Sequence, residues 1–402
     1  MSLKTVANLK DSVAGILSGI DLNNVDNLNG ALERAARVLV QQADIPEASG
    51  IQNITLYSGV YDYPCNSNVF GTAINDIRPQ GVTREPQDFV YKRYPSDFDR
   101  MKQWLPNGTM CAFQYQNGSP ILRIKSTLTT QQVNISKMSD DADWTASGSV
   151  SNLTDDASVY YQEPSSLRFT LTGSSAGVLT ATPNPISISS YEDVGVAFLA
   201  IQIPTGATAA NLTSIQLKLG SSASDYDSVT QTTGFLGAWT AGEWLLVSFD
   251  FSGSTSTGTP NWSAIDYVQV TINHTGTFTN FRLGGLWISL PSQNQLMYQT
   301  AALFLPSGST TPSTNITATT DTILLSDPAY TIYEYESAIS VLQQTGGTNA
   351  DPTMSELQSV LHGDGKRTGL YNHYRGDNPS AELRQIGSWY SGSDYGYGYG
   401  NF

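Results

Sequence analysis

The feature that most constrains this chain is a long stretch of short segments in which apolar and polar residues alternate. Within residues 140–290 these segments include Ser166–Thr172, Val194–Ile203 and Tyr267–Ile272. Glycine, serine, aspartate, asparagine and proline separate them, as turn residues separate strands. No helical stripe of twelve residues interrupts the pattern. The stretch is therefore predicted to be an antiparallel β-sandwich of jelly-roll type.

The flanking residues combine helices with strands. Apolar residues at helical spacing predict helices over 3–19, 28–40 and 330–344. Strand-like runs lie between them, and Asn117-Gly118 is a typical hairpin turn. The predicted fold class is mainly β with peripheral helices, an α+β assembly domain interrupted by the jelly roll. The predicted parts are a helical arm (1–49), a discontinuous α+β domain (50–139 and 291–386), the jelly roll (140–290) and a Gly/Tyr-rich tail (387–402).

Charge separates the jelly roll from the rest of the chain. The 402 residues carry a net charge of -15, and residues 140–290 contribute 3 basic and 13 acidic side chains, a net of -10. An acidic surface disfavours binding to nucleic acid or to an anionic membrane. Only 14% of all residues are charged, which suits large subunit interfaces depleted of charge. No secretory signal and no membrane span is expected.

Signals for catalysis are weak. The three histidines lack metal-ligand spacing, and the common nucleophile, phosphate and zinc motifs are missing. We therefore predict no catalytic residue and no enzymatic activity. The acidic groups at 140–143, 192–193 and 225–227 are interpreted as solvated turn carboxylates. A structural Ca²⁺ in the jelly roll and paired carboxylates for glycoside hydrolysis are the alternatives; no other cofactor is expected.

Two candidate binding regions follow from aromatic residues. Five of the seven tryptophans lie in 140–290, and two of them stand in loops rich in small polar residues. Flat aromatic rings beside hydrogen-bonding groups suit sugars, which predicts a glycan site of Asp225, Tyr226, Trp239 and Trp262; packing of the two tryptophans in the core or at a strand end is the alternative. Basic and aromatic residues lie close together over 84–102, which predicts a protein interface of Arg84, Lys92, Arg93, Tyr94, Arg100 and Lys102; a loop or short helix that packs its aromatic residues is the alternative.

Several segments resemble known proteins. GEWLLVSFDF at 242–251 and PNWSAIDYVQVTI at 260–272 resemble carbohydrate-binding-module-like jelly rolls appended to tailed-bacteriophage virion proteins. ITLYSGVYDYP at 54–64 and TDTILLSDPAYTIYEYESAI at 320–339 resemble phage neck and tail proteins.

This resemblance implies a non-enzymatic structural component of a virion, at the neck, head-tail connector or tail. Such a protein assembles in the bacterial cytoplasm and resides in the virion. Its expected partners are neck, portal or tail subunits, copies of itself and host-surface glycans. The alternative is a carbohydrate-binding adhesin or fibre protein for host recognition.

Overall fold

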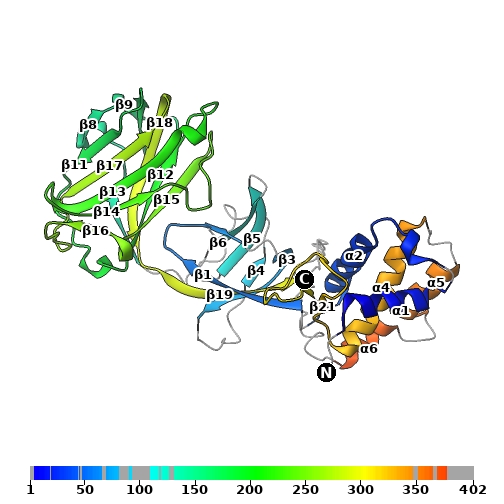
Figure 1. Ribbon diagram of the computed structural model, residues 1–402. Helices are drawn as coiled ribbons and strands as arrows, with labels where there is room; N and C mark the ends of the chain where they lie inside the picture. Colours follow the sequence, from blue (N-terminus) through cyan, green and yellow to red (C-terminus); the bar gives the residue numbers. More distant parts are fainter. Residues whose placement is uncertain are drawn as a thin grey trace, which may run out of the picture.

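The computed structural model describes residues 4–18, 20–43, 45, 48–65, 69–80, 90–92, 109–116, 119–125, 131–346, 352–364 and 369–377. Its described part is mainly β with several helices, in agreement with the predicted fold class. A large sandwich lies at one end in Figure 1, two small sheets follow, and a group of helices lies at the other end.

The sandwich consists of two six-stranded sheets. In the first, the order is β15-β12-β18-β10-β9, with β7 beside β18; in the second it is β16-β14-β13-β17-β11-β8. The sandwich begins with β7, which precedes the boundary predicted at residue 140. The strands of the first sheet are β7 (Gln132–Ser136), β9 (Val150–Asp156), β10 (Ser166–Leu171), β12 (Val196–Gln202), β15 (Trp244–Asp250) and β18 (Phe278–Ser289). Those of the second are β8 (Trp144–Gly148), β11 (Gly177–Ala181), β13 (Leu212–Ser222), β14 (Asp225–Gln231), β16 (Thr255–Thr257) and β17 (Tyr267–His274).

The alternation in the sequence explains the sandwich interior. In β17, Val268, Val270 and Ile272 are buried, whereas the residues between them are half-buried. Successive side chains of a strand point to opposite faces, so one face of β17 lines the core and the other faces outward. The two sheets enclose one apolar cluster along their length.

Strand β12 differs because both of its faces are buried. Ala197, Leu199 and Ile201 line the sandwich core, whereas Val196 and Phe198 belong to a second apolar cluster outside it. That second cluster contains residues of the small sheets, such as Leu56. The outer side of the first sheet therefore packs into a second, neighbouring apolar core.

Two small sheets complete this neighbouring core. One has the order β1-β19-β3 and is antiparallel throughout; the other has the order β2-β6-β5-β4, with β4 and β5 parallel. Strands β5 and β6 pair around Asn117-Gly118, where a hairpin turn is predicted. The strands are β1 (Ser49–Leu56), β2 (Asp62–Pro64), β3 (Val69–Pro79), β4 (Val90–Lys92), β5 (Thr109–Gln116), β6 (Ser119–Lys125) and β19 (Ser292–Thr300).

The helices form a third core from both ends of the chain. The predicted arm at 1–49 is not separate, because its helices pack against those of residues 327–374 in one apolar cluster. Asn27 accepts a hydrogen bond from the Gly30 amide at 3.2 Å and so caps the second helix. None of the described helices is long and apolar enough to cross a membrane.

The helices are α1 (Val6–Ile16), α2 (Leu28–Gln42), α4 (Asp327–Gln344), α5 (Pro352–His362) and α6 (Leu370–Asp377). Short 3₁₀ turns occur at Leu22–Asn24, Asp141–Asp143, Ser189–Tyr191, Ala209–Asn211 and Phe251–Gly253, and a two-residue pair joins β20 (Phe304–Leu305) to β21 (Thr322–Ile323).

Trp287 joins the sandwich to the small sheets. Its indole Nε1 donates a hydrogen bond to the Ser58 carbonyl at 3.0 Å, and its ring is stacked with that of Phe198 at 5.8 Å between centroids. The side chain is 1% exposed. A buried ring of this size removes a large apolar area from water and leaves a large cavity when truncated.

We expect Trp287→Ala to lower the free energy of unfolding by about 3–5 kcal/mol, because it opens a cavity between two cores and removes a buried donor. Chemical denaturation followed by circular dichroism measures this change. Tyr160→Ala, which truncates an exposed aromatic ring, is the control and should change the free energy by less than about 1 kcal/mol. A similar small loss for Trp287→Ala would show that the junction does not hold the two parts together.

Candidate functional site: an uncovered face of the sandwich

The outer face of the first sheet is largely covered. The small sheets pack over Val196 and Phe198, and the segment 157–165 packs beside them. Within this segment, the Tyr161 ring lies 5.8 Å from Trp244 and 6.1 Å from Trp287, measured between centroids. This sheet therefore offers little continuous surface for a ligand.

The outer face of the second sheet carries no such cover in the described residues. Its side chains stand in three cross-strand rows, because direct antiparallel partners point to the same face. We call these residues the polar sheet face. The rows are Thr257, Tyr226 and Tyr267; then Thr255, Ser228, Lys218, Gln269, Thr180 and Thr145; then Thr230, Gln216, Thr271, Val178 and Ser147.

Two tyrosines form the aromatic part of the polar sheet face. Tyr226 and Tyr267 belong to β14 and β17, which flank β13, yet their rings lie only 6.2 Å apart and are tilted by 35°. Gly220 of β13 stands between them in the register. A Cβ atom there would lie 2.6 Å from the Tyr226 Cβ, so the missing side chain permits this close approach.

Amides and hydroxyls surround the ring pair. Gln216 donates to the Thr230 hydroxyl at 3.2 Å, and Gln269 donates to the Thr180 hydroxyl at the same distance. These bonds orient the two amides across the sheet. The polar sheet face is therefore flat, hydroxyl-rich and nearly uncharged, although it belongs to an acidic domain.

Lys218 carries the one charge within the three rows. Its ammonium lies 4.4 Å from the centre of the Tyr226 ring, a cation–π contact. Hydrogen bonds from Thr257 and Lys218 lower the pKa of the Tyr226 hydroxyl, whereas burial raises the pKa of Tyr267. Tyr267, whose pKa lies above the ordinary tyrosine value of about 10, keeps its proton at neutral pH.

The structure separates the four residues predicted to bind a glycan. Tyr226 lies on the polar sheet face. Asp225 lies next to it but secures a turn: it accepts hydrogen bonds from the Thr259 amide at 3.0 Å and the Ser222 hydroxyl at 2.7 Å. Trp239 lies in the loop before β15, packs against the sandwich core and is not a member of the rows that contain Tyr226.

The expectation of an exposed Trp262 is corrected. Its side chain is 3% exposed and packs edge-on against Phe251 at 5.2 Å between ring centroids. Its Nε1 donates to the Asp227 carboxylate at 2.7 Å. A buried carboxylate requires such donors, and this requirement holds the tryptophan inside the sandwich.

Sequence reasoning missed Tyr267, Lys218 and Gln269. Their signal is the alternation itself: in β17 the half-buried positions are Tyr267, Gln269, Thr271 and Asn273. Polar residues at every second position identify the outward face of a strand, but they do not tell which outward faces stay uncovered.

The predicted protein interface lies almost entirely outside the described residues. This applies to Arg84, Arg93, Tyr94, Arg100 and Lys102. Lys92 ends the short strand β4, and its side chain is not among those described.

One acidic group could hold a cation. Carboxylate oxygens of Asp140, Asp141 and Asp155 all lie within 4.8 Å of one another. The other two acidic groups named from the sequence, at 192–193 and 225–227, form no such three-ligand group among the described residues. Hard cations such as Ca²⁺ take several oxygen ligands of this kind. Burial and the neighbouring carboxylates raise the pKa of Asp155, so these charges repel one another.

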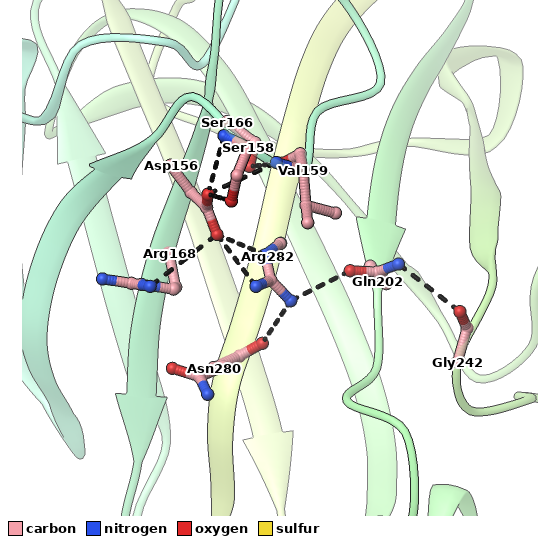
Figure 2. A network of polar contacts seen from close by, with 9 residues as sticks. All are labelled: Asp156, Ser158, Val159, Ser166, Arg168, Gln202, Gly242, Asn280 and Arg282. Atoms are coloured by element: carbon pink, nitrogen blue, oxygen red, sulfur yellow. Dashed lines mark hydrogen bonds and ion pairs between the residues drawn. The ribbon is translucent and has the colours of Figure 1, made fainter.

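The adjacent Asp156 has the opposite environment, on the outer side of the first sheet (Figure 2). Its carboxylate accepts hydrogen bonds from Ser158 and from the Arg282 Nε, the latter at 2.9 Å. Burial by itself would raise the pKa of Asp156, but these bonds outweigh it and hold the pKa well below its usual range. Asp156 is 5% exposed.

We expect Asp156→Asn to lower the free energy of unfolding by about 3–5 kcal/mol at pH 7, because Arg282 loses a buried partner. Asp155→Asn, the matched neighbouring change, should raise it by less than about 1 kcal/mol by relieving repulsion. Urea denaturation between pH 7 and pH 3 measures both.

Each difference from the wild-type protein should shrink on acidification. The stabilisation by Asp156 is present above the ordinary aspartate pKa of about 3.9 and is lost as the pH falls below it. The repulsion at Asp155 is present above its raised pKa and disappears as the pH falls through it. Equal effects of the two variants would contradict this assignment of partners.

No protein-family model and no curated protein matches the chain. Solved structures are similar to the sandwich. A family 30 carbohydrate-binding module of the cellulosomal cellulase Cel9D-Cel44B of Clostridium thermocellum aligns with 40% of this chain and 97% of its own length, at 14% identity and a TM-score of 0.31. A family 11 module from the same organism, in complex with a β-1,3-1,4-mixed-linked tetrasaccharide, aligns with 39% of this chain and 94% of its own, at 11% identity and a TM-score of 0.28.

Proposed function

We propose that this protein binds a neutral glycan on the polar sheet face and does so without catalysis. The observation that carries the proposal is the Tyr226–Tyr267 ring pair, which lies among hydroxyls and amides on the outer sheet face that the rest of the described chain leaves uncovered. The sequence-derived adhesin interpretation thus keeps Tyr226 but replaces the two tryptophans by Tyr267.

The chemistry of the polar sheet face suits sugars. A pyranose ring presents C–H groups on its faces and hydroxyls around its rim. The negatively polarised face of an aromatic ring attracts C–H groups, and Gln216 and Gln269 can exchange hydrogen bonds with hydroxyls. With Lys218 as the one charged group of the rows, this surface matches an uncharged polysaccharide better than a charged partner.

The packed junction between the sandwich and the small sheets supports a role of the protein in attachment to a glycan. The Trp287 junction keeps the sandwich in a set orientation relative to the small sheets, and the helices lie at the far end of the molecule (Figure 1). A glycan on the polar sheet face would therefore be held at a defined place relative to the remainder of the protein.

A glycan array probed with the full chain identifies a ligand, and titration calorimetry then gives its affinity. We expect Tyr226→Ala and Tyr267→Ala each to weaken binding roughly tenfold or more, as expected for aromatic residues that carry most of a contact. Tyr160→Ala is the matched control: Tyr160 is a 40% exposed tyrosine in the segment over the other sheet, and its loss should leave the affinity unchanged.

Either of two results would contradict the proposal: no array glycan bound by the wild-type protein, or full affinity in both tyrosine variants. Circular dichroism of each variant separates loss of binding from loss of fold.

A structural role in a tailed-phage virion is the second candidate. The observation that favours it is the helical core, which both chain ends build at the end opposite the sandwich, where it could contact other subunits (Figure 1). In this case the protein assembles in the bacterial cytoplasm with neck, portal or tail subunits. Mass spectrometry of purified particles should then detect the chain, and its absence would exclude this role.

A further inference from the structure

The outer side of the first sheet carries a cluster of two arginines and one carboxylate, so one positive charge has no negative counterpart. Arg168 of β10 and Arg282 of β18 are direct cross-strand partners. They lie on opposite sides of the Asp156 carboxylate (Figure 2). Like charges placed directly opposite each other in a sheet are destabilising, and one carboxylate balances only one of them.

Arg282 uses the carboxylate almost completely. Its Nε and Nη2 lie 2.9 and 2.8 Å from the same Asp156 oxygen, and its Nη1 donates to the Gln202 side chain at 3.0 Å. The other Asp156 oxygen accepts from the hydroxyl and amide of Ser158 and from the Val159 amide. Asp156 therefore has no strong site left for a second guanidinium.

Arg168 is left without a full partner. Its Nη1 lies 3.8 Å from Asp156, and it donates no hydrogen bond to any residue that the structure describes. Its side chain is 39% exposed, so a solute can reach it. Two of the three basic residues in 140–290 thus form a cluster with a net charge of +1 in a region that carries 13 acidic residues.

The chemistry of Arg168 selects an oxyanion. A guanidinium presents a planar fork of donors that matches a carboxylate, and such charge-assisted pairs are the stronger hydrogen bonds in proteins. Thr154 of β9 is the cross-strand partner of Arg168 and can add a hydroxyl on the same face.

We propose that Arg168, with Thr154 beside it, binds a carboxylate on the outer side of the first sheet, as a second site independent of the polar sheet face. The carboxylate belongs to a sugar acid or to a small free acid. Binding completes the cluster, so that each guanidinium faces one carboxylate.

Galacturonate is the probe, galactose is its uncharged counterpart, and acetate represents the free acid. Chemical-shift titration of the full chain at low ionic strength should show binding of galacturonate and no comparable binding of galactose at Arg168. Arg168→Gln should weaken galacturonate binding roughly tenfold. Arg37→Gln removes the same charge from the exposed side of α2 in the helical core and should leave the affinity unchanged.

Acetate affinity equal to that of galacturonate would assign the site to free carboxylates, and weaker acetate binding would assign it to sugar acids; both support the site. The proposed site at Arg168 would be overturned if Arg168→Gln and Arg37→Gln weakened galacturonate binding equally. It would also be overturned if Tyr226→Ala abolished galacturonate binding. Arg168→Gln should keep its affinity for a neutral array glycan, so failure here is distinguishable from failure of the proposed function.

Discussion

Burial of the first sheet of the sandwich on both sides is the constraint on which the rest of the molecule depends. Alternate residues of β12 belong to two cores, with Leu199 inside the sandwich and Phe198 outside it. Trp287 of β18 extends the outer core by its stacking and by its bond to Ser58. Because close-packed interiors resist displacement, the sandwich and the small sheets act as one body.

Because of this burial, the outer faces of the two sheets differ in how much of each is packed and how much is exposed to solvent. The first sheet uses much of its outer side for packing, and Arg168 lies partly exposed there beside the buried Asp156–Arg282 pair. The outer face of the second sheet carries mainly hydroxyls, amides and the Tyr226–Tyr267 pair, with Lys218 as the one charge of its rows. A neutral glycan and a carboxylate would therefore bind on opposite sides of one sandwich, through aromatic contact and through ion pairing respectively.

Local patterns in the sequence predicted most elements of secondary structure. Helical spacing over 28–40 corresponds to α2, and Asn27 caps it. The strands on either side of the turn predicted at 117–118 are paired antiparallel. Strand β12 differs from its prediction as an alternating segment: it is a continuous apolar run, because a strand covered on both faces loses its alternation. Short α6 was not predicted, because eight residues carry little periodic signal.

Sequence alone determined that residues 140–290 belong to an acidic sandwich, although not that β7 precedes them in it, because alternation and turn residues act between near neighbours in the chain. Tertiary structure alone decided which aromatic residues reach solvent. Trp262 stands in a polar loop, yet Asp227, 35 positions away, draws it inside. Tyr226 and Tyr267 meet only because β13 places Gly220 between them. Such contacts join distant segments, and their energies depend on which surfaces pack together, which no local pattern records.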